Sequence, residues 1–317
     1  MKNVRKANFL QVNNEIRRLL AEEGVIMLPS SQAYKKLKWT RDHFEQKPEE
    51  GYFIWVKKQI SHPLTTCIAI SSPKISQNPR NLIVIEKGVK AEVHSICNTM
   101  KKSLYGSHIG RTKVILKEQS TLQMRHFHKW EKGDVVSSSI HFHLEKEAKL
   151  YHVYKCLDVP EELKTELNSF LDSSSSANIE TAVLAKRGNI NMYDSTFLNG
   201  EEASATIRIR MVADQDSKIT SHSKLIANNA GIGHLDCMGL LLSEKSSIST
   251  VPELINKNKN ATLTHEASVG RISQEALNYL RSRGLTEDGA IDFIITGFLR
   301  KTVFVYKGRV PPSKNYM

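Results

Sequence analysis

The sequence predicts a mainly β protein with α-helical segments at both ends, on three observations. From about residue 52 to residue 250, short strand-like runs follow one another with little helical periodicity between them. Asn-Gly and Asp-Gly pairs, which mark tight hairpins, are scarce in this stretch, and this favours a parallel solenoid over an antiparallel meander. Both flanking segments instead space their apolar residues at helical intervals. The pattern by itself leaves a sandwich, a barrel or a parallel β-helix open for the core.

The N-terminal region, residues 1–60, is predicted to be helical. After a break around Pro29, a helical stretch carries Ala33, Leu37 and Trp39. Before the break, one apolar stripe recurs at helical spacing: Phe9, Val12, Ile16 and Leu19.

The central region, residues 61–255, is predicted to form the β core. In its clearest strand Ile207, Ile209 and Met211 point to one face, while the residues between them point to the other. Residues 160–171 are predicted to interrupt the strands as a helix. The predicted strands include 81–86, 113–117, 122–127, 149–154, 179–185, 206–212 and 217–227.

The C-terminal region, residues 256–317, is predicted to be a helical domain. Ser273 can cap a first helix, and Gly284 is placed to end it. Thr286 then begins a second helix whose early acidic residues suit the positive end of the helix dipole.

The composition excludes several classes of protein. The 317 residues carry 45 Lys and Arg against 33 Asp and Glu, a formal net charge of +12, which is compatible with an acidic partner. No apolar run approaches the roughly 20 residues that span a bilayer, and no apolar core of a signal peptide follows the N-terminus. We therefore expect a cytoplasmic protein without a membrane segment. The 4 cysteines form no CxxC pair, so in a reducing cytosol they are buried thiols or reactive groups.

Two pairs of histidines occur at strand spacing. His126 and His128 flank one phenylalanine, and His141 and His143 flank another. Residues two apart in a strand share a face, so each pair presents two imidazoles together. The pairs are interpreted either as ligands for Zn, Fe or Ni or as a solvated strand face.

A thiol, an imidazole and an acid lie on short C-terminal segments. Cys237, His265 and Glu266 could together ligate iron, although Cys237 and His265 could equally be core residues. Because iron–sulfur clusters are normally held by four cysteines, such a mixed set would hold a cluster less securely. This set suits a site that gives its cluster away.

Three C-terminal motifs closely resemble the SufB/SufD family, the scaffold proteins of the SUF iron–sulfur cluster assembly machinery. They are the Gly231-Ile-Gly-His-Leu-Asp-Cys237-Met-Gly segment, the Thr264-His-Glu-Ala-Ser-Val-Gly-Arg271 segment, and the helix pair 277–298. The helix pair contains Tyr279-Leu-Arg-Ser-Arg-Gly-Leu-Thr-Glu, a long and specific match. The resemblance covers about residues 80–300.

The resemblance implies a fold and a set of roles. The family fold is a right-handed parallel β-helix with helical ends. Cys237 resembles the cysteine on which the nascent cluster is built, Glu266 its acidic partner, and His265 a histidine at the subunit interface. Cys97 resembles the cysteine that receives persulfide sulfur, and Trp130 an aromatic residue along the route to the cluster site. Cys67 and Cys156 are left as buried thiols.

The resemblance also implies partners. The cargo would be a labile iron–sulfur cluster, expected to be [4Fe–4S], passed on to recipient apo-proteins. The C-terminal helices would dock a SufC-type ABC ATPase. This chain has no GxxxxGK[ST] phosphate loop, so it is expected to be a scaffold and not an enzyme. The expected docking residues are Leu277, Tyr279, Arg281, Arg283, Ile294 and Phe298.

The motifs depart from the family pattern in ways that suggest a homodimer. Thr264 stands where the family has the first acid of its E-H-E triplet, which removes one ligand, and His126 stands at a threonine-like position. Cys237 and Glu266 are SufB-like, whereas the segment 269–271 is closer to SufD. If one polypeptide fills both the SufB and the SufD position, two copies related by a twofold axis would supply the roughly four ligands that a cubane cluster needs.

The sequence leaves two alternative functions open. The C-terminal helix pair, with Arg281, Arg283, Arg300 and Lys301, resembles a helix-turn-helix in a basic protein that binds nucleic acid. A β-helix enzyme acting on polysaccharide is the other alternative, although no convincing pair of carboxylates is recognisable.

Overall fold

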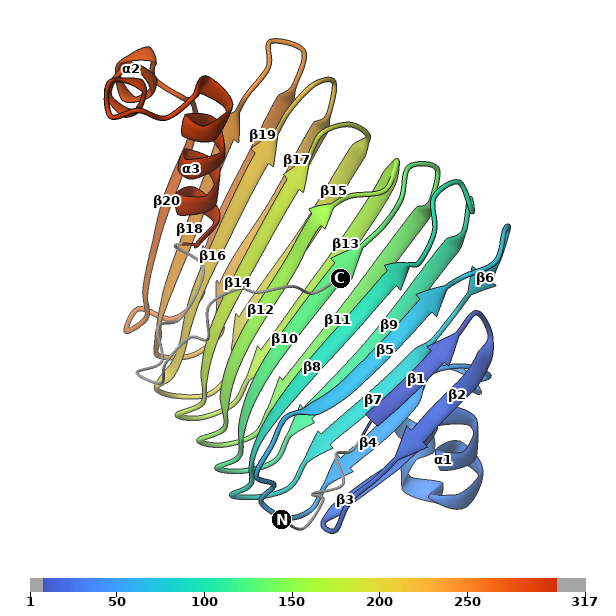
Figure 1. The fold of residues 1–317 in the computed structure, drawn as a ribbon. Helices are drawn as coiled ribbons and strands as arrows, with labels where there is room; N and C mark the ends of the chain where they lie inside the picture. The colour runs from blue at the N-terminus through green and yellow to red at the C-terminus, as the bar shows by residue number, and fades with distance from the viewer. Residues whose placement is uncertain (1–7, 301–317) are drawn as a thin grey trace.

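The chain forms a parallel β-solenoid, which a computed structural model describes for residues 8–300 (Figure 1). From β8 onward, successive strands alternate between two sheets, so each strand pairs in parallel with the second strand after it. This connectivity needs no tight hairpin, which explains the scarcity of hairpin signals. The predicted mainly β fold, a parallel solenoid with helical segments at its ends, is confirmed.

The strands lie in two sheets. In spatial order, the first sheet contains β2 (Glu15–Leu20), β1 (Asn8–Val12), β5 (Leu64–Ile70), β8 (Lys90–Thr99), β10 (Thr121–Lys129), β12 (Lys149–Asp158), β14 (Ser176–Ala185), β16 (Ala203–Ala213), β18 (Gly231–Leu241) and β20 (Thr262–Arg271). The second contains β19 (Ser247–Asn256), β17 (Lys218–Ala227), β15 (Asn189–Leu198), β13 (Glu162–Leu171), β11 (Val135–Leu144), β9 (Ser107–Leu116), β7 (Arg80–Ile85), β4 (Tyr52–Val56) and β3 (Val25–Pro29), with β6 (Ser76–Gln77) beside β9. The helices are α1 (Ser30–Lys36), the 3-10 helix η1 (Lys38–His43), α2 (Gln274–Ser282) and α3 (Glu287–Arg300).

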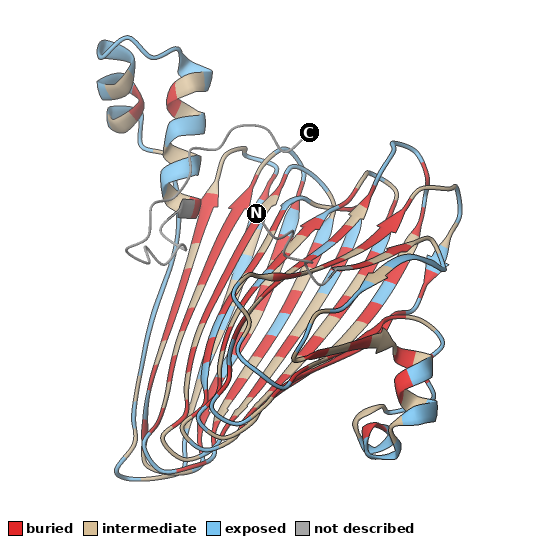
Figure 2. Cartoon of the chain, turned by 60° about the horizontal axis from the view of Figure 1, so that its bottom comes forward, coloured by how far each residue is buried: buried red, intermediate tan, exposed pale blue. Residues whose placement is uncertain are grey.

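The core lies between the two sheets, and alternate residues of each strand enter it. Burial alternates along most of the strands, as Figure 2 shows. In β10, for example, Leu122, Met124, His126 and His128 are buried, whereas the residues between them are half-buried or exposed. Neighbouring strands keep their register, so inward residues line up in rows that run along the solenoid.

The predicted helix over the apolar stripe at residues 9–19 is wrong. The stripe forms the antiparallel pair β1–β2, whose turn places Asn13 at φ 55, a left-handed conformation that asparagine tolerates. β1 then extends the first sheet by pairing in parallel with β5. Pairing with β5 decides the conformation, because spacings of three and four residues do not distinguish a short helix from a bulged strand.

Within residues 8–60, helical structure is limited to α1 and η1, which contain the predicted Ala33 and Trp39. Ala33 packs with Phe53 and Leu82 on the outer face of the second sheet. The predicted helix at residues 160–171 is also wrong, because these residues form β13. Leu163 and Leu167 are four apart and suit either structure, and in the strand Thr165 lies between them on the inward face. The division into three domains stays a prediction.

Helix α2 begins and ends where the sequence predicts, and α3 begins where it predicts, but residues 262–271 of the region predicted to be helical form the strand β20. The Ser273 hydroxyl accepts a hydrogen bond from the Ala276 N–H at 3.1 Å, and Gly284 ends the first helix at φ 93. The Thr286 hydroxyl caps α3 by accepting from the Gly289 N–H at 3.1 Å. Helix α3 then packs on the outer face of the first sheet, where Leu299 meets Val212 and Leu240. Within residues 8–300, none of the helices has the length and apolar character to span a bilayer.

Candidate functional site

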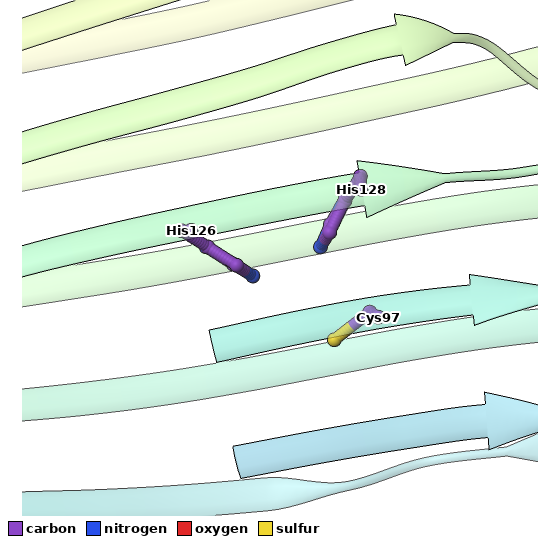
Figure 3. Close-up of side chains that lie close together, drawn as sticks. All are labelled: Cys97, His126 and His128. Atoms are coloured by element: carbon purple, nitrogen blue, oxygen red, sulfur yellow. The ribbon is translucent and has the colours of Figure 1, made fainter. Parts of the chain in front are cut away.

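Cys97, His126 and His128 meet inside the solenoid. Cys97 of β8 lies directly beside His128 of β10, and His126 precedes His128 by two residues on the same inward face. One ligand atom from each residue lies within 4.8 Å of the other two, and the three side chains converge in Figure 3. Among residues 8–300, this is the one group of three such ligands. The pair His126 and His128 is therefore buried and is not a solvated strand face.

Burial sets the protonation of this group. Loss of solvent lowers the pKa of His126 to about 4 and that of His128 well below its usual value, where the neighbouring His126 and His108 add to the effect. Both imidazoles are therefore neutral at pH 7. Burial also raises the pKa of the Cys97 thiol far above its usual value, so without a cation beside it this cysteine is protonated.

Aromatic side chains enclose the group. The Trp130 ring lies 5.4 Å from the His128 ring and 5.0 Å from the His108 ring. The Tyr154 hydroxyl is 3.0 Å from Nδ1 of His128. Neither Nε2 of His128 nor the indole N–H of Trp130 has a hydrogen-bond partner among the described residues. The predicted sulfur-handling pair, Cys97 and Trp130, thus borders one buried polar centre.

Cys237 lies near the C-terminal end of the same interior. It is buried in β18, between Ile209 of β16 and Ala267 of β20. Burial raises the pKa of its thiol to about 11, and the nearby hydroxyls of Thr250 and Ser223 oppose part of this shift. Because Cys237 is fully buried, a cluster built on it would need the strands around it to move apart.

The other two predicted cluster ligands lie on β20. His265 pairs in register with the inward-facing Leu235, so it shares the inner side of the sheet with Cys237. Glu266 pairs with Asp236 and so lies on the opposite side. Both are exposed because β20 is the last strand of the first sheet. One chain therefore brings His265, but not Glu266, to the face of Cys237.

A single row of inward residues runs from the centre that contains His126 to Cys237, and Cys97 lies in the neighbouring row beside His128. From His126 the row reaches Cys237 after four strand spacings, a distance of roughly 19 Å. Most members of the row are polar, although an apolar interior is the rule for a solenoid core. The row contains Ser95, His126, Tyr154, Thr181, Ile209 and Cys237, all buried.

The facing sheet adds polar groups to this row. Asp194 of β15 is buried beside Ser223 of β17, and burial raises the pKa of its carboxyl to about 7. A cavity of about 20 Å³ lies between Asp194, His126 and Tyr154. A space of this volume, lined by polar groups, can hold about one water molecule. Sequence reasoning missed Asp194, because only the folded coils bring residues of β15 and β10 to the same cavity.

A larger cavity opens on the surface beside Trp130. It measures about 550 Å³, and its lining combines five basic side chains with three acidic ones. Its Lys and Arg residues give it a net positive lining that suits small anions. The basic residues are Lys102, Lys129, Lys132, Lys186 and Arg187.

The six residues predicted to dock a partner divide into residues that pack inside the protein and residues that lie at its surface. Leu277 is buried, and Ile294 and Phe298 pack α3 against the solenoid. Tyr279 is 59% exposed. Sequence reasoning missed Phe293, an exposed aromatic residue of α3 (63%).

Arg281 and Arg283, two basic residues of the C-terminal helical segment, have intramolecular partners. Arg281 forms an ion pair with Glu287 at 3.4 Å. Arg283 lies over the Tyr279 ring at 5.3 Å. Lys301, named in the nucleic-acid alternative, lies outside the described residues.

The second histidine pair lies on the outer face. His141 and His143 of β11 are half-buried, and the His143 ring stacks on Phe170 at 4.9 Å. Nε2 of His141 lies 3.6 Å from Oε1 of Glu166. The two histidine pairs share a sequence pattern but differ in environment, because His126 and His128 occupy the inward positions of β10, whereas the inward positions of β11 are taken by Ile140, Phe142 and Leu144.

Comparison with known proteins identifies the family. The family model described as "SUF system FeS cluster assembly, SufBD core domain" matches residues 68–298. An iron–sulfur cluster assembly SufBD family protein of Archaeoglobus fulgidus is 27% identical over 87% of this chain and 79% of its own length. One from Methanothermobacter thermautotrophicus is 26% identical over 93% and 78%. The iron–sulfur cluster assembly protein SufB of Bacillus subtilis is 24% identical over 78% of this chain and 55% of its own. With its motifs, solenoid and buried cysteines, the chain belongs to the SufBD family, and this family supports a role in iron–sulfur cluster assembly.

Proposed function

We infer that this chain is a homodimeric scaffold on which a labile iron–sulfur cluster, expected to be [4Fe–4S], is assembled at Cys237 and passed to apo-proteins. The observation that carries this proposal is the buried polar row that ends at Cys237, beside the open end of the solenoid. Cys237 supplies the thiolate, and His265 on the same face supplies a second donor. The chain acts as a binding protein and not as an enzyme.

The open end of the solenoid supports the homodimer. β20 and β19 are the terminal strands of their sheets, and their outer edges carry backbone groups available for pairing. A twofold contact at this end would bring two copies of Cys237 and His265 together, enough for the roughly four ligands of a cubane. Glu266, on the outer side of β20, would reach the cluster only from the partner copy or after β20 moves.

Sulfur delivery is assigned to Cys97. A donor persulfide transfers its outer sulfur to the Cys97 thiol, whose proton passes to the departing donor sulfur. This leaves a Cys97 persulfide and a donor thiol without change in electron count. The basic cavity beside Trp130 would attract the anionic donor group. The buried row then leads toward Cys237, where conversion to sulfide takes two electrons from a separate reductant. The four cysteines are free of disulfides, as expected in a reducing cytoplasm, the compartment we propose.

Cluster reconstitution tests the assignment of Cys237. The purified chain, incubated anaerobically with iron and sulfide, is expected to form a dimer that carries the cluster's visible absorption. The Cys237→Ala variant should lose most of this absorption, because it removes the only cysteine sulfur at the open end within residues 8–300. Cys156→Ala, which removes another buried thiol, is the matched control and should retain it. Equal cluster content in the Cys237→Ala variant and the parent would refute the assignment.

The SufC-type ATPase is proposed to dock on the helix-pair patch, defined as Tyr279, Leu285 and Phe293. All three are exposed apolar side chains on or between α2 and α3. We expect Phe293→Asp to weaken capture of the ATPase by at least tenfold, about 1.4 kcal/mol, as measured by co-purification and titration. Ile232→Asp places the same charge on a similarly exposed apolar residue of β18 and should leave capture unchanged. Loss of capture in both variants, or in neither, would contradict this docking site.

Two observations weigh against the alternative functions. The match over residues 68–298 is to a cluster assembly family. In the nucleic-acid alternative, Arg281 and Arg283 already have intramolecular partners, which leaves fewer free cations on that edge. Neither a nucleic-acid ligand nor a polysaccharide is needed to explain the buried row.

A further inference from the structure

We propose that Cys97, His126 and His128 form a mononuclear site for a divalent transition metal ion of the Fe²⁺ or Zn²⁺ class, inside the solenoid and separate from the cluster site. One thiolate and two imidazoles are the ligands that these borderline ions prefer. The site does not rest on the function assigned to Cys237, which lies roughly 19 Å from His126 along the row.

The geometry of the three ligand atoms fits such an ion. They lie within 4.8 Å of one another. With metal–ligand bonds of about 2.0–2.3 Å, the ligand atoms of a tetrahedral site lie roughly 3.3–3.8 Å apart. Rotation of the three side chains can shorten the distances between their ligand atoms to this range. The strands hold the backbone in place, since Cys97 and His128 are paired in register.

The hydrogen bonding of His128 points the same way. Its Nδ1 is 3.0 Å from the Tyr154 hydroxyl, whereas its Nε2 is buried and has no hydrogen-bond partner among the described residues. If Nδ1–H donates to the Tyr154 oxygen, the lone pair of Nε2 faces the group without a partner. Histidines that bind metals typically donate their second ring N–H in this way, which fixes the tautomer. A buried acceptor without a partner is costly, and a metal ion would remove that cost.

Three protein ligands leave one coordination position open. The cavity of about 20 Å³ lined by His126, Tyr154 and Asp194 borders one of the three ligands and has room for about one water molecule, which could fill this position. Because the ion and a persulfide compete for the same Cys97 sulfur, metal occupancy would control whether Cys97 can accept sulfur. The site would thus be regulatory with respect to the proposed sulfur route.

Cobalt binding tests the proposal on the full, metal-stripped chain under anaerobic conditions. Co²⁺ substitutes for Zn²⁺ or Fe²⁺ and reports a thiolate ligand through a sulfur-to-cobalt charge-transfer band. We expect one Co²⁺ per chain with this band, and loss of the band in Cys97→Ala and Cys97→Ser. His126→Gln and His128→Gln should each weaken binding by at least about tenfold. Tyr154→Phe, which removes only the partner of His128, should weaken binding roughly tenfold and keep the band.

Two cysteine variants serve as controls and separate this proposal from the cluster assignment. Cys156→Ala removes the thiol beside His128 on the next strand, and Cys237→Ala removes the proposed cluster ligand. Both should keep the parent cobalt spectrum. A band that survives in both Cys97 variants, or that disappears in Cys237→Ala, overturns the internal site. Absence of thiolate-bound cobalt in the parent overturns it as well. Thermal unfolding of each metal-free variant establishes that it is folded before titration.

Discussion

Lowering the pH from 7 to 5 should destabilise the metal-free protein by several kcal/mol. Burial lowers the pKa values of His108 and His152 to about 3 and that of His126 to about 4, and it lowers that of His128 as well. Below about pH 6.5 the unfolded chain therefore binds protons that the folded chain does not. Each such histidine removes about 1.4 kcal/mol of the free energy of unfolding per pH unit.

Asp194 acts in the opposite direction. Its pKa is raised to about 7, so between its ordinary value and pH 7 the folded state binds the extra proton. Its contribution cancels one of the four histidines, and the remaining three give a slope of roughly 4 kcal/mol per pH unit between about pH 4 and 6.5. The free energy of unfolding of an ordinary domain is about 5–15 kcal/mol, so a change of one or two pH units removes a large part of it.

Urea unfolding at a series of pH values, in the presence of a chelator, measures this slope. His152→Leu is the informative variant, because neither ring nitrogen of His152 has a hydrogen-bond partner among residues 8–300. The variant should reduce the slope by about one third. A free energy of unfolding that is flat between pH 5 and 7, or an unchanged slope in the variant, would contradict the burial of neutral histidines.

Removing one partner of the Arg210–Asp236 ion pair should cost about 3–5 kcal/mol of stability. The pair is almost fully buried, with Arg210 4% and Asp236 7% exposed. The guanidinium binds the carboxylate through two hydrogen bonds, of 2.9 and 2.5 Å, and so ties β16 to β18. Asp236→Ala leaves a buried cation without its counter-charge, and this desolvation cost is the source of the loss.

A double-mutant cycle checks the size of the effect. Arg210→Met combined with Asp236→Leu removes both charges and should recover most of the stability lost by either single variant. The pair Lys224–Glu253, at 2.7 Å on the exposed faces of β17 and β19, is the matched control. Glu253→Ala should cost less than about 1 kcal/mol. Equal costs for the buried and the exposed pair would show that burial is not the cause.

The pair also bears on the proposed cluster site, since Asp236 immediately precedes Cys237. The ion pair fixes the outer side of β18, while Cys237 on the inner side is held between its two neighbouring strands. A variant that loses the pair is therefore expected to loosen β18 before the rest of the solenoid.

Much of the fold followed from local patterns. Alternation in residues 205–212 predicts β16, and the sequence around Ser273 and Gly284 predicts the limits of α2. These signals are reliable because a two-residue alternation or a cap depends on a few neighbouring residues. The segments 9–19 and 160–171 were predicted wrongly because their apolar spacing suits a helix as well as a strand. Pairing with distant strands decides between the two.

The sequence by itself determined the family, through motifs around Cys237, Glu266 and Tyr279, and a mainly β architecture with helical ends. Only the tertiary structure placed Cys97 beside His128, since the register between β8 and β10 depends on the whole coil. The same applies to the two histidine pairs, which have one spacing but lie inside and outside the solenoid. The physical reason is that strand periodicity fixes which residues share a face. Which face is buried, and which residues meet across coils, depends on packing between segments far apart in the chain.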